Sequence, residues 1–139
     1  MKKVFRPILA IVLAISSIFI FASCSGAPLP EGVDEEAVIS SAKEIVTQIS
    51  NREYEMVVEK LDDQMKQTLD ADGMQEAFGA NLDRLGKLES FQSEAAAGGT
   101  SSEIGDYSTI ALVCKYENGK AVYTISIDLD GKICGLYMK

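Results

Sequence analysis

The sequence predicts an α+β fold in which amino-terminal helices pack on one face of a curved antiparallel sheet. Apolar residues recur at helical spacing up to Gly86, and they alternate with polar residues after it. The second half is also rich in Thr, Val, Ile and Tyr, which strands favour. Asn118-Gly119 and Asp130-Gly131 are typical of two-residue hairpin turns, so we expect the last three strands to follow one another directly.

The start of the chain has the parts of a bacterial export signal. A cationic segment over residues 2–6 is followed by an apolar run over residues 8–22, and small residues precede Cys24. This run is shorter than the roughly 20 residues that span a bilayer, so it favours a cleaved signal peptide over residues 1–23. The segment Phe21-Ala22-Ser23-Cys24 resembles the lipobox of bacterial lipoproteins. Cys24 is therefore the predicted lipidation site.

A lipidated Cys24 would fix the mature protein to a membrane. Two acyl chains hold a protein stably on a bilayer, and the diacylglyceryl group of a lipoprotein supplies two. We expect the protein on the outer face of the bacterial cytoplasmic membrane, or on an outer membrane where the source has one. Two alternatives stay open, which are an ordinary signal peptide that contains a cysteine and an uncleaved anchor.

The mature chain divides into a tether and one domain. Residues 24–33 contain the lipidated cysteine and a tether rich in Gly and Pro, which would reach about 30 Å when extended. Residues 34–139 have the size of a single α+β domain. The signal peptide carries three of the 13 basic residues and none of the 21 acidic ones, so the mature chain has a formal charge of −11. This charge argues against nucleic acid as a partner.

Three amphipathic helices are expected before Gly86. The first covers residues 34–50, and its acidic first turn suits the positive end of a helix. The second covers residues 54–65, with Asn51 as its candidate cap, and the third covers residues 72–85. Asp72 and Gln75 have the spacing of a capping box, and Gly86 is typical of a helix end. The apolar stripe of the first helix contains Val38, Ile39, Ala42, Ile45, Val46 and Ile49.

Four strands are expected in the second half of the chain. The first two cover residues 88–97 and 106–116, with a loop over residues 98–102 between them. The two hairpin turns then set the register of the remaining strands. They would place Glu117 opposite Lys120 and Leu129 opposite Lys132.

The same register decides where the other two cysteines lie. Cys114 would lie opposite Tyr123, and Cys134 would lie opposite Ile127. Because a third strand separates the two cysteines, their Cα atoms should be too far apart for a disulfide. No disulfide is therefore predicted, although the protein is expected to be exported.

The register also sorts the side chains of the last three strands into two faces. The inner face is almost entirely apolar, and we expect the helices to cover it. It contains Ile110, Leu112, Cys114, Tyr116, Ala121, Tyr123, Ile125, Ile127, Leu129, Cys134, Leu136 and Met138. The outer face is a mixed surface of Thr109, Ala111, Val113, Lys115, Val122, Thr124, Ser126, Asp128, Ile133, Gly135 and Tyr137. The candidate ligand pocket consists of seven inner residues, which are Leu112, Cys114, Tyr116, Tyr123, Ile125, Ile127 and Leu136.

Three segments carry a family resemblance. They are Leu61-Asp62-Asp63-Gln64-Met65-Lys66, Gly86 just before the first strand, and Asp128-Leu129-Asp130-Gly131-Lys132-Ile133-Cys134-Gly135-Leu136. The chain resembles the bacterial family known as domain of unknown function 3887, within the nuclear-transport-factor-2-like superfamily. This resemblance implies a cone-shaped, cystatin-like roll of helices and curved sheet. It also implies an envelope module, alone or ahead of a hydrolase, and it assigns no catalytic residues.

The sequence offers no clear reaction centre. It contains no His, which removes the commonest general base and metal ligand. Ser40 and Lys43 match the S-x-x-K motif of penicillin-binding enzymes, but the companion motifs are missing. Residues 128–131 are interpreted as a hairpin turn rather than a calcium loop, and Asp62, Asp63, Asp70 and Asp72 as helix caps and ends rather than paired catalytic carboxylates. No catalytic residue, metal or cofactor is predicted.

Three functions stay open. The first is a non-catalytic envelope module that binds a small apolar ligand inside the cone, or an envelope protein. The second is a structural or dimerisation module with a filled core, whose partner is a second copy of the chain. The third is an enzyme of unknown reaction. It is least favoured because the inner face carries no carboxylate, His or Lys.

Overall fold

Eight elements of regular structure follow one another in the computed structural model, which describes residues 26–139. The helices are α2 (Glu35–Ser50), α3 (Tyr54–Lys60), α4 (Asp63–Lys66) and α5 (Ala71–Leu85). The strands are β1 (Leu88–Ser101), β2 (Gly105–Tyr116), β3 (Gly119–Asp128) and β4 (Ile133–Met138). The predicted signal peptide and Cys24 lie outside the described residues. Of the described helices, none is long and apolar enough to cross a membrane.

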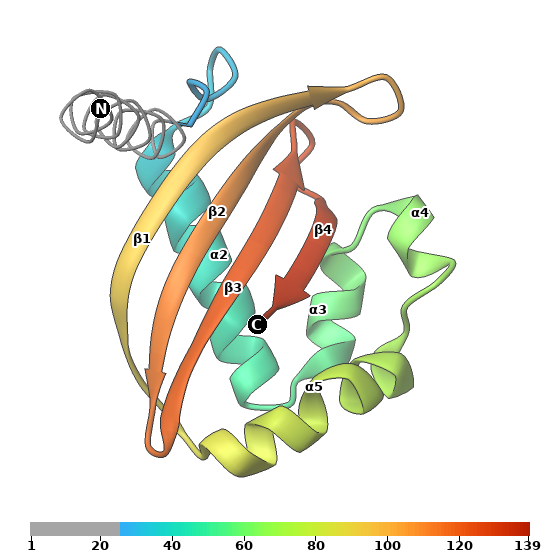
Figure 1. The fold of residues 1–139 in the computed structure, drawn as a ribbon. Helices are drawn as coiled ribbons and strands as arrows, with labels where there is room; N and C mark the ends of the chain where they lie inside the picture. Colours follow the sequence, from blue (N-terminus) through green and yellow to red (C-terminus); the bar gives the residue numbers. More distant parts are fainter. Residues whose placement is uncertain (1–25) are drawn as a thin grey trace, which may run out of the picture.

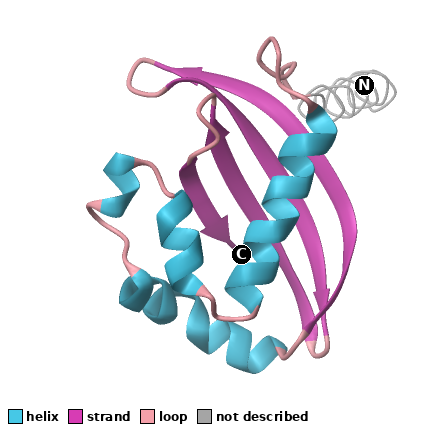
Figure 2. Ribbon diagram, turned by 180° about the vertical axis from the view of Figure 1, so that it is seen from behind, coloured by secondary structure: helices cyan, strands magenta, loops and turns pink. Residues whose placement is uncertain are grey.

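The four strands form one antiparallel sheet in the order β1-β2-β3-β4. Figures 1 and 2 show the sheet from opposite sides, with α2 running along its concave face and α3 and α5 beside it. The predicted α+β fold, with helices on one face of a curved antiparallel sheet, is confirmed. Strand β1 extends to Ser101, so the expected loop over residues 98–102 is mostly strand.

Aspartate side chains cap the amino-terminal ends of three of the four described helices. Asp34 accepts hydrogen bonds from the backbone N–H groups of Glu36 at 2.9 Å and Ala37 at 3.3 Å. Asp70 accepts one from Gly73 N at 2.7 Å, so this residue caps α5 and the prediction of Asp72 as the cap is wrong. The cap therefore lies two residues earlier than the sequence pattern predicts, and α5 begins at Ala71.

The predicted second helix is interrupted near Leu61. This residue forms a parallel bridge with Ile133, and the backbone N–H of Asp62 donates to the carbonyl of Ile133 at 2.9 Å. The backbone must be extended to pair with β4, so α3 ends at Lys60. Asp62 then caps α4 by accepting from Met65 N at 2.8 Å. A long-range pairing thus divides a segment whose local pattern is continuous.

The turn between β2 and β3 lies one residue earlier than predicted. Tyr116 pairs with Gly119, so the two turn residues are Glu117 and Asn118. Carbonyl groups at the end of α5 and just after it hold this turn, because Asn118 N donates to Leu85 O at 2.9 Å and Glu117 N donates to Lys87 O at 3.0 Å.

This change of turn moves the pairing of β2 and β3 by two residues. Cys114 lies opposite Ala121, and Tyr123 lies opposite Leu112. The prediction that Cys114 faces Tyr123 is therefore wrong. An even shift leaves every side chain on its predicted face, because successive residues of a strand point to opposite sides.

The turn between β3 and β4 has three residues instead of two. Asp128 N donates to Lys132 O at 2.9 Å, and Gly131 has a φ of 78°, as in a type I turn that ends in a left-handed residue. The Asp128 carboxylate accepts from the backbone N–H groups of Asp130 and Lys132 at 3.0 and 2.9 Å. The motif over residues 128–131 therefore stabilises its own turn, as the hairpin interpretation expected.

A bulge in β4 shows that two further predictions are wrong, which are the pairing of Cys134 with Ile127 and the position of Ile133 on the outer face. Ser126 pairs with Gly135 as predicted, but Ile127 pairs with Ile133, so Cys134 is an extra residue between the two pairs. Ile133 is consequently buried in the core instead of lying on the outer face. Cys134 is half-buried, and Leu129, expected on the inner face, is 59% exposed in the turn. Cys114 and Cys134 are free thiols on strands that β3 separates.

The first described residues of the expected tether, 26–29, lie against β1. The backbone N–H of Gly98 donates to the carbonyl of Ala27 at 2.9 Å. A turn closed by Val33 N and Pro30 O at 3.1 Å then leads into α2. The described part of the tether therefore belongs to the folded domain.

Candidate functional site

The seven residues of the candidate ligand pocket lie on the concave face of the sheet, but they form its core. All except Leu136 are at most 5% exposed. They share one cluster with apolar residues of the helices, including Ile45, Ile49, Val57 and Leu82. Of the seven, only Ile127 lines any of the hollows described for residues 26–139. The inner face is thus occupied by the protein's own side chains.

A chain of three hydroxyl groups crosses this apolar core. The Tyr123 and Tyr116 hydroxyls are hydrogen-bonded at 2.8 Å, and the Tyr116 hydroxyl is bonded to Ser50 Oγ at 2.7 Å. Burial raises the pKa of Tyr116 and of Tyr123, so both phenols are neutral at physiological pH. A neutral phenol is a weak nucleophile and a weak base, and the chain satisfies buried polar groups.

Ser50 connects this hydroxyl chain to a hollow of about 650 Å³ at one end of the sheet. We call it the end hollow. It lies where α2 and α5 finish beside the turn between β2 and β3, at the bottom of Figure 1. Its lining consists of Thr47, Ser50, Asn51, Arg52, Leu82, Asp83, Gly86, Lys87, Leu88 and Glu117.

Three of the four charged side chains that line the end hollow, those of Arg52, Asp83 and Glu117, are engaged with one another or with the backbone. Arg52 forms an ion pair with Asp83 of α5, and Glu117 Oε1 accepts from the backbone N–H of Lys87 at 2.8 Å. The carboxyl ends of two helices add partial negative charge. The end hollow is therefore polar, with both signs of charge on its wall, and it suits a small polar group better than the apolar ligand expected from the sequence.

Arg52 is held in an unusual backbone conformation. Among the described residues, it is the only non-glycine residue with a positive φ, at 62°. Its backbone N–H donates to Ile49 O at 3.0 Å, and the next N–H, of Glu53, donates to Gln48 O at 2.8 Å. These bonds reverse the chain after α2 and direct the Arg52 side chain toward α5.

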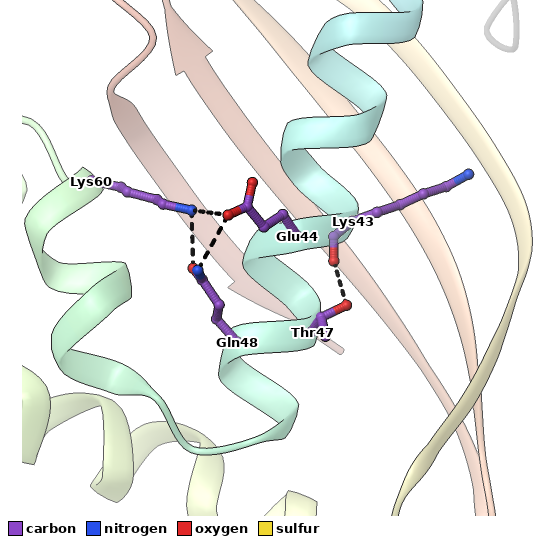
Figure 3. Close-up of polar contacts among 5 residues, drawn as sticks. All are labelled: Lys43, Glu44, Thr47, Gln48 and Lys60. Carbon is purple, nitrogen blue, oxygen red and sulfur yellow. Dashed lines mark hydrogen bonds and ion pairs between the residues drawn. The ribbon is translucent and has the colours of Figure 1, made fainter.

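The polar side chains in the middle of α2 fasten this helix on both sides (Figure 3). Lys60 Nζ of α3 lies 3.0 Å from Gln48 Oε1 and 3.2 Å from Glu44 Oε1. On the opposite side, Lys43 pairs with Glu94 of β1, and its Nζ lies 5.6 Å from the centre of the Phe91 ring. These contacts hold α2 between α3 and β1.

The S-x-x-K motif contributes Lys43 to the contact between α2 and β1. Ser40 and Lys43 both line a hollow of about 430 Å³ between α2 and β1. Glu94 lines the same hollow and forms the ion pair with Lys43. An ammonium held by a carboxylate is poorly suited to remove a proton from a serine hydroxyl. The geometry supports the structural interpretation of this motif.

The two thiols are also poorly suited to chemistry. Burial raises the pKa of Cys114 to about 11. Burial also raises the pKa of Cys134 to about 11, with smaller contributions from Asp128 and Asp62. The thiolate is the nucleophilic form, so both cysteines are weak nucleophiles at neutral pH.

The structure brings together several residues that the sequence analysis did not single out. Ser50, Arg52, Asp83 and Lys87 were not among the predicted site residues. Ser50 could have been recognised from its spacing. It lies four residues after Val46, so this polar residue falls on the stripe of α2 that faces the core. Arg52 and Asp83 are 31 residues apart, and no local pattern indicates that they pair.

Comparison with known proteins places this fold in a family. Residues 42–136 match the family described as "Protein of unknown function (DUF3887)". The chain belongs to this family. The matched span of this DUF3887 protein runs from the middle of α2 into β4, so it includes every residue that lines the end hollow and all three residues of the hydroxyl chain.

A solved structure supports the fold of this DUF3887 protein. The NMR structure of a protein from Ruminococcus gnavus ATCC 29149 is similar, with a TM-score of 0.70 and 23% sequence identity. The similarity covers 80% of this chain and 96% of that chain. No curated protein matches the sequence.

Proposed function

We propose that this DUF3887 protein is a lipid-anchored, non-catalytic module of the bacterial cell envelope that binds a protein partner through the outer face of its sheet. The observation that carries the proposal is the contrast between the two faces. The inner face is filled by the helices, whereas no described helix covers the outer face. A small apolar ligand between sheet and helices would have to displace core side chains.

The outer face has an uncharged centre. Three rows of paired residues cross it, and they contain Ser93, Val113, Val122 and Lys139; Ala95, Ala111, Thr124 and Tyr137; and Ala97, Thr109, Ser126 and Gly135. Of these residues only Lys139, at the β4 edge of the sheet, has a charged side chain, although the mature chain has a formal charge of −11. Protein interfaces are depleted in charge at their centres and enriched in Tyr.

Two large apolar side chains mark the part of this face best suited to a partner. Tyr137 is 62% exposed and Val122 is 36% exposed. They lie on neighbouring strands, because Tyr137 pairs with Thr124, two residues after Val122 on the same face. An exposed Tyr beside an aliphatic side chain offers a large, rigid contact area together with a hydrogen-bonding hydroxyl.

A photo-crosslinking amino acid in place of Tyr137 is expected to form a covalent adduct with a partner protein in irradiated cells. The control position is Met56 on α3, which is 47% exposed but lies on the helical side. The readout is the mass of the adduct on a denaturing gel. A product of twice the chain's mass would identify a second copy, and another mass would identify a different protein. Equal adduct formation at both positions, or none at position 137, would contradict the proposed surface.

Membrane attachment is the second part of the proposal and has its own test. Replacing Cys24 with Ala is expected to remove the protein from the membrane fraction, because the lipid is its proposed anchor. Cys134→Ala is the matched control and is expected to stay membrane-bound. The measurement is cell fractionation, with the mass of the mature chain to detect the diacylglyceryl group. A Cys24→Ala protein that remains on the membrane would speak against lipid anchoring.

A further inference from the structure

We propose that the tether docked on β1 fixes the orientation of the domain on the membrane. The end that carries the β1–β2 turn would rest at the lipid headgroups, and the end hollow would point away from them. This inference rests on the lipid anchor of the proposed function. It adds to that anchor a defined membrane-facing surface.

The contact between tether and strand depends on glycine residues. Gly98 N donates to Ala27 O at 2.9 Å, and a Cβ atom at position 98 would collide with the carbonyl oxygen of Pro28. A Cβ atom on Gly26 would lie only 2.5 Å from the Cβ of Ala97. The two segments therefore approach closely because neither Gly26 nor Gly98 has a side chain.

The docked segment is also fixed at its other end. Pro28 and Pro30 restrict the backbone, and the carbonyl of Pro30 accepts from Val33 N at 3.1 Å. Asp34 follows at once and caps α2. The chain is thus held by β1 on one side and by the start of α2 on the other, so it cannot swing as a free tether would.

Little free chain remains between the lipid and the domain. Only Ser25 separates Cys24 from Gly26 in the sequence. Two residue steps reach about 7 Å when fully extended. This reach is much shorter than the roughly 30 Å expected for a tether that continues to Val33. The domain must therefore stay close to the bilayer surface.

The position of the docked segment determines which end is close to the lipid. Gly98 lies three residues before the end of β1, next to the β1–β2 turn. In Figure 1 the first described residues lie at the top, with this turn, whereas α5 and the β2–β3 turn lie at the bottom. Strand β2 joins the two ends with 12 residues, which corresponds to about 40 Å.

The charges of the membrane-facing end indicate how it meets the bilayer. Glu31, Glu103 and Asp130 are exposed there together with the cation Lys132, and the carboxylates, which are in excess, are repelled by an anionic leaflet. Leu129 is exposed at the same end, but a single apolar side chain adds little membrane affinity. The lipid, and not insertion of this surface, would hold the domain at headgroup level.

The chain contains no Trp, so one introduced Trp can report on each end. The experiment uses the mature lipidated protein in vesicles that contain a phospholipid with a spin-labelled headgroup, which quenches nearby Trp fluorescence. Ser102→Trp reports on the β1–β2 turn, and Lys120→Trp reports on the opposite end. We expect severalfold stronger quenching at position 102. Equal quenching at the two positions would overturn the proposed orientation.

A second substitution tests the docked tether itself. Gly98→Val should displace Pro28, and the ratio of quenching at the two positions should fall toward unity. Ala95→Val is the matched control, because Ala95 is exposed on the same strand, and it should keep the original ratio. Circular dichroism would show that both variants are folded. An unchanged ratio in a folded Gly98→Val protein would refute the role of the tether. Failure of the parent protein to carry lipid or to bind vesicles would instead overturn the proposed anchor, and this inference with it.

Discussion

Replacing Leu112 with Ala is expected to lower the free energy of unfolding by about 2–5 kcal/mol. Leu112 is 0% exposed and lies at the centre of the concave face, where the helices fill the space beside it. Removing its isobutyl group would leave a cavity that the packed neighbours can only partly close. Urea unfolding followed by circular dichroism measures this loss.

The neighbouring residue provides the control. Val113 lies on the same strand but on the outer face, where it is half-buried. Val113→Ala should cost about 1 kcal/mol or less, because the shortened side chain is already in contact with solvent. If the two variants lost similar stability, the concave face would not be a packed core. A ligand-sized space on that face would then have to be reconsidered.

The comparison of predicted and observed strands shows why the faces of the sheet could be predicted from the sequence. The predicted turn at Asn118-Gly119 is wrong by one residue, which moves the register of β2 and β3 by two. An even shift preserves the faces, so Leu112, Tyr116 and Tyr123 are buried as predicted. The bulge at Cys134 is an odd insertion, and Ile133 changes face because of it.

Two errors in the predicted elements have the same physical cause, which is long-range pairing. The α5 terminus holds the β2–β3 turn, and β4 interrupts the second predicted helix at Leu61. Neither contact leaves a periodic signal in the sequence, because each joins segments far apart in the chain. Local propensity correctly predicts that a helix or a turn occurs there, but tertiary contacts decide the residue at which it ends.

The candidate site was harder to predict than the fold for a related reason. An apolar inner face is compatible with a hollow cone and with a filled one, because the sequence does not show how closely α2, α3 and α5 approach the sheet. The bond between Ser50 and Tyr116 joins residues 66 positions apart. The hydroxyl chain beside the end hollow can therefore be identified only from a structure that places α2 against the sheet.

Gly86→Ala is expected to be strongly destabilising, because α5 and the β2–β3 turn approach each other closely at Gly86. Its φ of 79° and ψ of −148° lie in a region that only glycine adopts readily, and strain of this kind costs about 1–3 kcal/mol. A Cβ atom at this position would also lie 3.2 Å from Glu117 Cβ and 3.2 Å from Asn118 Nδ2. The substitution should therefore strain the backbone and push the β2–β3 turn away from α5.

Gly105→Ala separates these two effects. Gly105 has a similar φ of 83°, but a Cβ atom there would meet nothing within 4 Å. It should therefore lose stability through backbone strain alone, and the additional loss in Gly86→Ala would measure the crowding of the docked turn. Thermal unfolding of both variants under the same conditions provides the comparison. Equal losses would mean that the β2–β3 turn can move away from α5 without loss of stability. Contact with α5 would then no longer explain why the hairpin turns at Glu117 and Asn118 instead of at Asn118 and Gly119.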